Sequence, residues 1–291
     1  MIRVILQGGL GNQMFEYAAA YALSQRKNVP FALDMSYMDV FGQKSWCRPY
    51  ELSVFALHHT ATFTHDKHWA VRFLPRLRTW CRKRGVATLG RYIFELESLD
   101  KAPNCKSLIL FDYFANCHLF EQYREDLLQA FTFAEKPNEA NTNLLQEITS
   151  TNAVAVHIRR GDYLNNANAN VFYHPTADWY RRAMEKIETQ VKVPHYYFFS
   201  DDIAWVKEQF ADMPNATFVD INHGKEAYND MRLMSACKHN IIANSTFSWW
   251  AAWLNTNSYK IVIAPARYYM NDEGNHKYLS RMIPSGWITI E

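Results

Sequence analysis

The sequence predicts an α/β protein of two domains with mostly parallel strands. Its 291 residues are enough for about two domains, at ~150 residues each. Short apolar runs alternate with helical stretches along most of the chain, and this alternation is typical of strand–helix–strand units. From residue 152 onward the alternation becomes regular, which favours parallel strands joined by helices.

In the first half of the chain, the clearest sequence signals for strands and helices come at its start. An apolar run at 2–7 predicts a strand, and the glycines that follow predict a tight turn. After this turn, apolar residues recur at helical spacing. A second strand ends on Asp34, and beyond it the signals weaken. The elements expected here are strands at 2–7, 29–33 and 108–111 and helices at 12–26, 69–84 and 121–133.

The second half predicts strands and helices in turn. Pro175 precedes the first of these helices and is a typical start signal. The strands are expected at 153–158, 196–199, 217–219, 240–243 and 261–264, and the helices at 176–189, 203–210, 225–238 and 246–254. A polar segment at 135–152 separates the two halves, so we expect domains at 1–150 and 151–291.

Composition excludes several classes of protein. With 31 basic and 29 acidic residues the net charge is +2, which is too balanced for a whole-chain nucleic-acid binder. No run reaches the ~18 apolar residues of a membrane-spanning helix. Residues 1–6 leave no room for the parts of a signal peptide. The five cysteines form no C-x-x-C pair, which favours reduced thiols and a cytoplasmic location.

The first candidate site is the glycine-rich turn that ends with Gly11-Asn12-Gln13. Glycines permit close backbone approach, and a helix N-terminus beside them favours an anion or a polar ligand. A dinucleotide site is one interpretation, because Asp34 ends the next strand at a suitable distance. However, Met14 stands where that fingerprint needs Gly or Ala. A plain strand-to-helix turn is the other alternative.

The second candidate site ends an apolar strand with His157-Ile158-Arg159-Arg160-Gly161-Asp162. Side chains alternate along a strand, so His157 and Arg159 share one face. Ligands of open α/β sheets bind at the carboxyl ends of strands, and the guanidinium fork suits phosphate. Asp162 is expected to pair with Arg160. A salt-bridged turn without a ligand is the alternative.

The third candidate site is the turn Asn244-Ser245-Thr246, between a predicted strand and a predicted helix. Hydroxyls and free helix N–H groups together suit a phosphate, and simple helix capping is the alternative. Trp249 and Trp250, just beyond, are expected to pack in the core rather than to stack on a sugar.

The fourth candidate is Asp230, near the start of a helix whose buried face is expected to follow it. Its carboxylate has the acceptors for a guanine N1–H and exocyclic amine, whereas a helix-dipole role is the alternative. The pair Asp201-Asp202 is expected to cap a helix rather than to bind a metal. P-loop, H-E-x-x-H and G-x-S-x-G motifs are absent from the sequence.

Taken together, these segments resemble the α-1,2-fucosyltransferase family. Four segments show the resemblance. The first is Gly8-Gly9-Leu10-Gly11-Asn12-Gln13-Met14-Phe15, and the second is the H-x-R-R-x-D-Y pattern from His157 to Tyr163. The other two are Phe199-Ser200-Asp201-Asp202 and Asn244-Ser245-Thr246-Phe247-Ser248-Trp249-Trp250. The resemblance spans residues 1 to about 265 and is weakest across 36–110.

The resemblance implies a GT-B architecture, with two Rossmann-like domains facing across a cleft. It implies that GDP-fucose binds the C-terminal domain and that a galactoside acceptor binds mainly the N-terminal one. The implied reaction is inverting, needs no metal or other cofactor, and forms an α-1,2 linkage. A fucosyltransferase of another linkage and a nucleotide-sugar-binding module without turnover are the alternatives.

The resemblance also implies roles for individual residues. Arg159 is expected to bind the β-phosphate and to stabilise the leaving group, and Asn12 to lie near the reacting sugar. The other expected donor contacts are His157 and Asp230 with guanine, Ser245 and Thr246 with phosphate, and Arg160, Asp162 and Gly11. No residue of the N-terminal half is identified as a general base.

The basic stretch at 69–84 supports a separate hypothesis. Its arginines are interleaved with Trp69, Phe73, Leu77 and Trp80 at helical spacing. One interpretation is a peripheral contact with the inner face of the membrane, where a lipid-linked glycan acceptor would lie. The alternative is a solvated helix whose apolar stripe packs on the N-terminal domain. Pro75 is expected to interrupt the helix.

Overall fold

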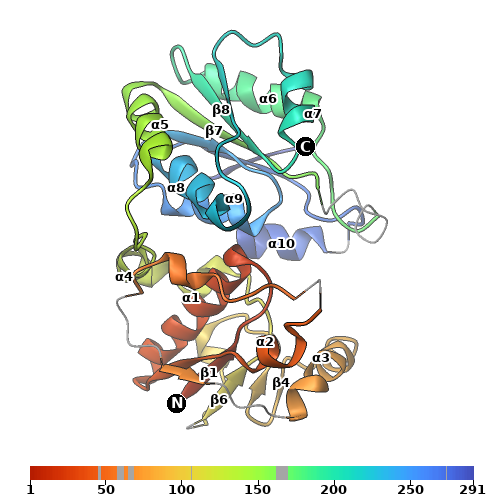
Figure 1. Cartoon of the computed structure of the whole chain (residues 1–291). Coiled ribbons are helices and arrows are strands. Elements are labelled where there is room, and N and C mark those ends of the chain that lie inside the picture. Colours follow the sequence, from red (N-terminus) through yellow and green to blue (C-terminus); the bar gives the residue numbers. More distant parts are fainter. Residues whose placement is uncertain (45–46, 58–61, 65–68, 106, 162–169, 273) are drawn as a thin grey trace. The chain divides into compact units, whose positions relative to one another are not determined.

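The computed structural model divides the chain into two compact units, Met1–Glu135 and Lys136–Glu291 (Figure 1). The first unit ends inside the polar segment in which the sequence places the domain boundary, and the helix at Glu139–Ser150 belongs to the second unit. The structure describes residues 1–44, 47–57, 62–64, 69–105, 107–161, 170–272 and 274–291.

The first unit holds a six-stranded sheet in the order β3-β2-β1-β6-β5-β4. All neighbouring strands run parallel except the β4–β5 hairpin. The strand order reverses between β1 and β6, which is the kind of position where open α/β sheets bind ligands. The strands are β1 (Ile2–Ile5), β2 (Phe31–Asp34), β3 (Thr62–Thr64), β4 (Thr88–Leu89), β5 (Tyr92–Ile93) and β6 (Leu108–Leu110).

The helices of the first unit confirm part of the prediction. Helix α1 is buried from its first turn to Ser24, because its alanines let it pack closely on the sheet. The helix expected at 69–84 is a 3-10 turn at Trp69–Arg72 followed by α3. Pro75 lies in the first turn of α3, where a proline is well tolerated, so the expected interruption of this stretch is confirmed. The predicted helix at 121–133 is a 3-10 turn followed by α4. The helices are α1 (Leu10–Lys27), α2 (Ser36–Phe41), α3 (Leu74–Arg82) and α4 (Arg124–Ala130).

The second unit holds a six-stranded parallel sheet in the order β12-β11-β10-β7-β8-β9. Counted from its first strand, this is the doubly wound order 3-2-1-4-5-6. The order reverses between β7 and β10, where Val156 lies opposite Ile241. The strands are β7 (Ala153–Ile158), β8 (His195–Ser200), β9 (Ala216–Val219), β10 (His239–Ile241), β11 (Val262–Pro265) and β12 (Ile288–Ile290).

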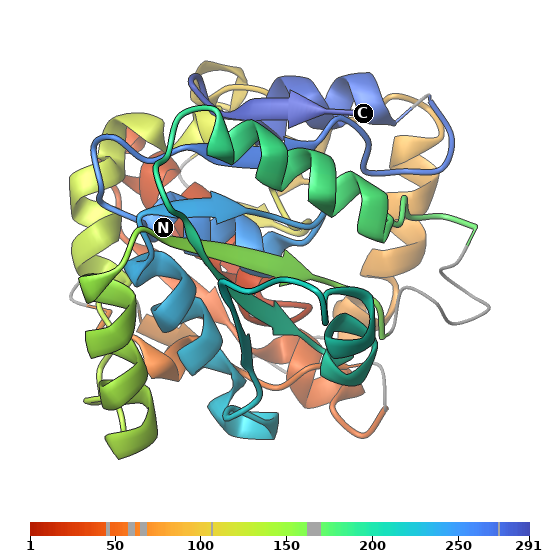
Figure 2. The same cartoon turned by 90° about the horizontal axis from the view of Figure 1, so that it is seen from above.

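Helices cover both faces of this second sheet. Helix α8 packs on both α5 and α9 (Figures 1 and 2), whereas α6 packs against the opposite face with Val154, Val156 and Ile158. Trp249 and Trp250 on α9 are fully buried, which confirms the core prediction for this pair. The helices are α5 (Glu139–Ser150), α6 (Ala177–Glu188), α7 (Ile203–Gln209), α8 (Tyr228–Ala236), α9 (Thr246–Leu254) and α10 (Asn275–Met282).

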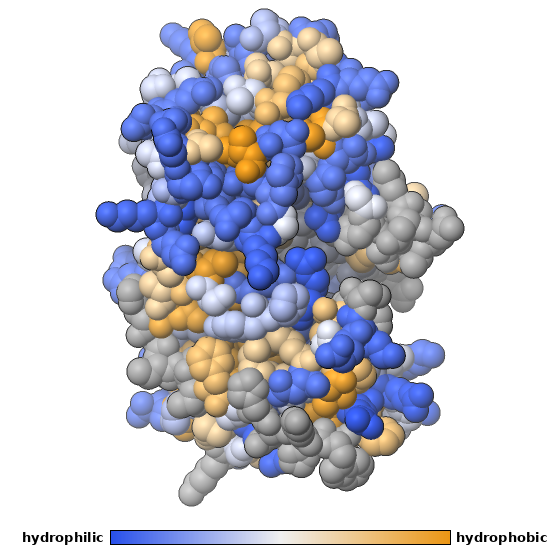
Figure 3. Space-filling model, viewed as in Figure 1, coloured by the Kyte–Doolittle hydropathy of each residue, from blue (hydrophilic) through white to orange (hydrophobic). Residues whose placement is uncertain are grey.

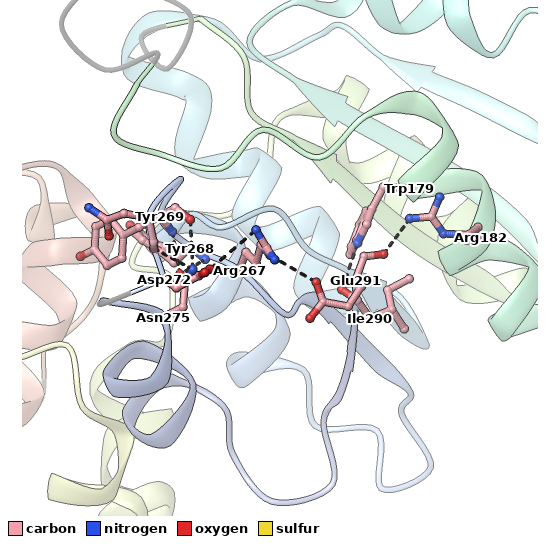
Figure 4. A network of polar contacts seen from close by, with 10 residues as sticks. Trp179, Arg182, Arg267, Tyr268, Tyr269, Asp272, Asn275, Ile290 and Glu291 are labelled. Carbon is pink, nitrogen blue, oxygen red and sulfur yellow. Dashed lines mark hydrogen bonds and ion pairs between the residues drawn. The ribbon is translucent and has the colours of Figure 1, made fainter.

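Polar contacts hold the last strand and the loop before α10 in place (Figure 4). The indole of Trp179 donates to the carbonyl of Ile290, at 3.1 Å. Arg267 forms an ion pair with Glu291, at 3.3 Å between Nε and Oε2. The side-chain oxygen of Asn275 accepts from the backbone N–H groups of Tyr268 and Tyr269. This loop therefore has a defined position, which matters because the carbonyl of Tyr268 accepts from Asn244 in the turn after β10.

Candidate active site

Two of the sequence motifs meet at the point where the strand order of the second sheet reverses. Arg159 follows β7 directly, and the turn 242–245 connects β10 to α9. Because β7 and β10 are parallel neighbours, both motifs lie at the same edge of the sheet. The structure thus brings together the second and third candidate sites of the sequence.

Asp201 organises the turn after β7. Its carboxylate accepts from the backbone N–H groups of Arg160 and Gly161, at 2.9 and 3.1 Å. The same carboxylate lies 3.1 Å from Nη1 of Arg159. A Cβ atom on Gly161 would lie only 2.7 Å from Oδ2 of Asp201, so the glycine is required for this contact. Asp201 therefore fixes both the backbone and the guanidinium at the end of β7.

Arg160 is held by a different set of contacts. Its Nε lies 3.0 Å from Oδ2 of Asp202, and its guanidinium lies 3.8 Å from the centre of the Trp205 ring. Asp202 also caps α7 by accepting from the backbone N–H of Trp205, which confirms the predicted capping role. The expected partner, Asp162, lies outside the described residues, and the partner that the structure gives Arg160 is Asp202.

His157 is almost fully buried, with 6% of its surface exposed. Burial, together with the nearby positive charge of Arg159, lowers the pKa of His157 to about 4. The imidazole is therefore neutral at physiological pH. Its Nδ1 has no hydrogen-bond partner among the described residues, and its ring lies 5.9 Å from that of Phe247 on α9. This neutral ring has hydrogen-bonding capacity that the described residues do not use.

The turn between β10 and α9 supplies the N-terminus of a helix. Ser245 is the N-cap residue, and its Oγ accepts from the backbone N–H of Phe247, at 3.3 Å. The side chain of Asn244 donates to the carbonyls of Tyr173 and Tyr268, at 2.7 and 3.0 Å. Capping is thus present, as in the alternative interpretation, and the helix N-terminus also carries the partial positive charge that favours an anion.

Asp230 lies in the first turn of α8, which packs on α9. Its Oδ1 accepts from the side-chain amide of Asn222, at 2.8 Å, and Asn222 pairs in turn with Asn141 of α5. Burial raises the pKa of Asp230 to about 7, although the Asn222 hydrogen bond opposes this shift. The carboxyl is therefore poised to ionise fully when a ligand offers N–H donors.

The glycine-rich turn lies in the first unit, at the end of β1. Gly8 has φ of 72°, and a Cβ there would lie 2.6 Å from Nδ2 of Asn12 and 3.0 Å from the ring of Tyr113. Glycine therefore permits the side chains of Asn12 and Tyr113 to approach the backbone of this turn. Gly11 is a buried residue in the first turn of α1. The structure thus places Gly11 and Asn12 in the first unit, and the other described site residues in the second.

The N-terminus of α1 differs from the sequence expectation. The carboxylate of Glu51 accepts from the backbone N–H of Leu10, at 2.6 Å, and the amide of Gln13 donates to the carbonyls of Gly8 and Pro49. The protein itself therefore supplies the negative group at this helix end. The interpretation of this turn as an anion site is not supported by these contacts.

A buried polar cluster lies beside the glycine-rich turn. Glu16 is fully buried, and burial raises its pKa well above the usual range. Its Oε2 accepts from the backbone N–H of Gln7, at 3.0 Å, whereas its Oε1 has no hydrogen-bond partner among the described residues. Arg78 of α3 donates to the side chain of Gln7 and lies 3.6 Å from Asp112, which follows β6. Sequence analysis missed this cluster, because its members are far apart in the chain.

Metal-ligating side chains gather elsewhere. Among the described residues, Cys117, His118 and Glu121 bring their ligand atoms within 4.8 Å of one another, in the first unit. Burial, with the neighbouring Glu121, raises the pKa of the Cys117 thiol. At the end of β7 and β8, by contrast, both aspartates are engaged with arginines.

Comparison with known proteins defines the class and then the family. The structure is similar to that of the NodZ α-1,6-fucosyltransferase soaked with GDP-fucose, with a TM-score of 0.54 and 13% identity, covering 87% of this chain and 92% of that one. The crystal structure of NodZ from Bradyrhizobium gives a TM-score of 0.55 at 12% identity, covering 86% and 91%. These similarities confirm the predicted fold class, GT-B with two Rossmann-like units.

Residues 1–291 match the model of glycosyl transferase family 11, and the chain belongs to this family. The O-antigen biosynthesis glycosyltransferase WbnK of Escherichia coli is 33% identical, covering 98% of this chain and 99% of its own. An α-1,2-colitosyltransferase of Escherichia coli is 32% identical, covering 98% and 97%. The bovine galactoside α-(1,2)-fucosyltransferase 2 is 25% identical, covering 85% and 67%. The predicted family resemblance is therefore confirmed.

Proposed function

We propose that this glycosyltransferase transfers L-fucose from GDP-β-L-fucose to the 2-hydroxyl of a terminal β-galactoside and forms an α-1,2 linkage with inversion. The observation that carries the proposal is the preorganised Arg159 at the end of β7, beside the N-terminus of α9. This arrangement suits a diphosphate leaving group. A relative named a galactoside α-(1,2)-fucosyltransferase supports the choice of sugar and linkage, and the α-1,2-colitosyltransferase supports the linkage.

Arg159 is the centre of the proposed mechanism. As the bond between C1 of fucose and the β-phosphate oxygen breaks, GDP leaves with the electron pair, and the guanidinium stabilises the growing charge. A preorganised donor of this kind is worth roughly 2.7–4 kcal/mol by analogy with oxyanion sites. Asp201 makes this preorganisation possible, because it holds the guanidinium before substrate arrives. Ser245 and Thr246 add the N-terminus of α9 as a second phosphate contact.

His157 and Asp230 are the proposed contacts with guanine. A neutral imidazole serves as donor or acceptor without adding charge, and the pKa of about 4 keeps it in that state. The Asp230 carboxylate would accept from the N1–H and the exocyclic amine, and these two donors would stabilise its ionised form. The donor sites of Arg160, Asp162 and Gly11 remain predictions of the sequence.

On the acceptor side, the proposed mechanism needs no strong general base from the protein. The fucosyl centre passes through an oxocarbenium-like state, as in other glycosyl transfers. In such a loose transition state the acceptor O2 bonds to C1 as the bond to the β-phosphate oxygen breaks. The O2 proton leaves late, to water or to the β-phosphate of GDP, with Asn12 as a hydrogen-bond partner of the hydroxyl. No cofactor enters this scheme, since GDP-fucose is a substrate and cationic groups neutralise the diphosphate.

A screen with defined substrates tests this function. Purified protein would be incubated with GDP-fucose and with β-1,3- and β-1,4-linked galactosides, and the product linkage would be assigned by NMR. We expect an α-1,2-fucoside. Another linkage, or GDP-fucose binding without GDP release, would replace the proposal by one of the two alternatives from the sequence.

One alternative donor sugar has support from the comparisons. Because a relative that matches nearly the whole chain is named a colitosyltransferase, GDP-colitose is the second candidate donor. Colitose is fucose without its 3-hydroxyl, so the two donors would be compared at equal concentration. If the enzyme preferred GDP-colitose, the proposed roles of the site residues would stand and the donor in the proposal would change. The acceptor would be an oligosaccharide or a lipid-linked glycan that ends in galactose.

A further inference from the structure

Helix α3 and the β4–β5 hairpin carry an unusual excess of positive charge. Residues 69–94 contain seven lysines and arginines and no acidic residue. The segment begins with the 3-10 turn Trp69–Arg72, and α3 then packs its inner side on β1 and β6, through Leu74 and Cys81. The packing expected of an ordinary helix is therefore present, and it accounts for only one side of α3.

Two of the seven cations are paired with a carboxylate of the first unit. Arg78 is 19% exposed and lies against Asp112 and the ring of Phe111. Arg82 forms an ion pair with the other oxygen of Asp112. These two side chains therefore belong to the fold of the first unit, and they are excluded from the surface considered next.

The remaining five cations form an exposed surface, which we call the basic face. None of them has a carboxylate partner in the part of the chain that the structure describes. Their charge is therefore available to an external anion. The basic face consists of Arg72, Arg76, Lys83, Arg84 and Arg91.

Large apolar side chains lie among these cations. Phe73 is 52% exposed and Trp80 is 46% exposed, and their spacing of seven residues puts them on one side of α3. Leu89, at the tip of the β4–β5 hairpin, is 43% exposed. Figure 3 shows hydrophilic side chains bordering hydrophobic ones over α3. Single exposed apolar residues are common, whereas exposed apolar side chains bordered by polar ones are typical of surfaces that bind a protein or a membrane.

We propose that the basic face binds reversibly to an anionic lipid bilayer, with Phe73, Trp80 and Leu89 entering the headgroup region. Cations that flank exposed aromatic residues are typical of helices that lie in a membrane interface. The guanidinium of Arg84 lies 4.4 Å from the Trp80 ring, so a cation and an aromatic ring would meet the bilayer at the same place. The anionic surface that meets such a face is that of the cytoplasmic leaflet.

A lipid surface fits the basic face better than a nucleic acid does. Phe73 and Trp80 have stacking surfaces, but Leu89 has none, and a bilayer accommodates all three. The net charge of the chain is only +2, so the attraction is confined to this face. Within the described residues, no helix combines the length and the apolar composition of a membrane span. The lipid contact would hold the first unit at the surface that carries lipid-linked glycans, whichever donor sugar the enzyme uses.

Co-sedimentation with lipid vesicles tests the proposal directly. The full chain would be mixed with vesicles of phosphatidylcholine alone, or of equal parts phosphatidylcholine and phosphatidylglycerol, at low and at high salt. We expect binding to the anionic vesicles only, with a loss at high salt. A basic residue near an anionic surface strengthens binding about fivefold. The variant with Arg76→Glu, Lys83→Glu and Arg84→Glu should therefore bind at least about 100-fold more weakly.

A matched variant controls for net charge. Lys186→Glu, Lys192→Glu and Lys225→Glu make the same change on exposed positions of the second unit, and this variant should sediment like the parent. Phe73→Ser with Trp80→Ser should weaken binding and leave its salt dependence in place. Fucosyl transfer to a water-dissolved galactoside should be unchanged in all variants, since none of the substituted residues has a role in the proposed mechanism.

Several results would overturn the proposal. Equal sedimentation with neutral and anionic vesicles, or equal losses in the two charge-reversal variants, would show that the basic face has no special role. Binding to single-stranded RNA without binding to vesicles would make the face a nucleic-acid surface instead. None of these readouts requires transfer activity, so failure of the proposed function leaves the vesicle result interpretable.

Discussion

The sheets of the two units both reverse their strand order, and the side chains at the two reversals differ in charge. Between β7 and β10, Arg159 and the N-terminus of α9 present positive charge. Between β1 and β6, Glu51 occupies the N-terminus of α1, and Asp112 neutralises Arg78. Topology therefore marks both positions as places where ligands bind. The local side chains then decide which of the two attracts a diphosphate.

The largest expected effect is at Arg159. Arg159→Ala should lower kcat by about 100- to 1000-fold, because one preorganised donor to the leaving group is lost. Arg159→Lys should also fail, since a point charge does not replace a bidentate fork. Transfer rates and thermal melting curves would be measured for both variants. Near-normal turnover in either folded variant would refute the role of this residue.

Asp201 should matter less than the arginine that it positions. Asp201→Asn should lower kcat by about 10- to 100-fold, because a misplaced guanidinium stabilises the leaving group less well. In the Arg159→Ala background the same change should have little further effect, since both act through one contact. Asp212→Asn, which alters an exposed ion pair with Arg181, is the control. Additive losses would mean that Asp201 acts independently of Arg159.

Asp230 should control donor affinity rather than the chemical step. Asp230→Asn should raise the KM for GDP-fucose by about tenfold and change kcat little, because guanine contacts are alike in the ground and transition states. The wild-type carboxyl must be ionised to accept two N–H donors, and its pKa is about 7. GDP affinity should therefore fall as the pH drops below 7, and this dependence should be absent in Asp230→Asn. A loss confined to kcat would place Asp230 near the reacting sugar.

Chelation should have the smallest effect. Asp201 and Asp202 are bound to Arg159 and Arg160, and cationic groups are proposed to neutralise the diphosphate. Transfer rates should therefore be the same with and without excess EDTA. If EDTA abolished activity and Mg²⁺ or Mn²⁺ restored it, the aspartate pair would become the leading metal-ligand candidate, and the mechanism would need revision.

The local elements of the fold were predictable from sequence, because strand–turn–helix signals span few residues. The strands before Gly8, Arg159 and Asn244 and the helices that follow the first and third of these were all found from periodicity and caps. Pro75 illustrates such a rule, because the stretch at 69–84 breaks just before it and α3 begins with this proline in its first turn.

The contacts that make the site were less predictable, because they depend on strand register. Asp201 reaches Arg159 and Gly161 only because Ile158 lies opposite Ser200 in the β7–β8 pair. Sequence proximity suggested Asp162 as the partner of Arg160, whereas the neighbouring strand end supplies Asp202. Asp112 and Arg78 likewise come from a strand end and a helix more than thirty positions apart along the chain.

A titration of GDP into matched arginine variants tests the comparison of the two units most directly. Calorimetry would be carried out on the parent, on Arg159→Ala and on Arg78→Ala, with melting curves to confirm folding. Arg159→Ala should weaken GDP binding by about tenfold or more, as expected for a lost charge-assisted contact, and Arg78→Ala should bind GDP like the parent. The opposite pattern, with GDP affinity lost in Arg78→Ala and kept in Arg159→Ala, would contradict the assignment of the diphosphate to the second unit.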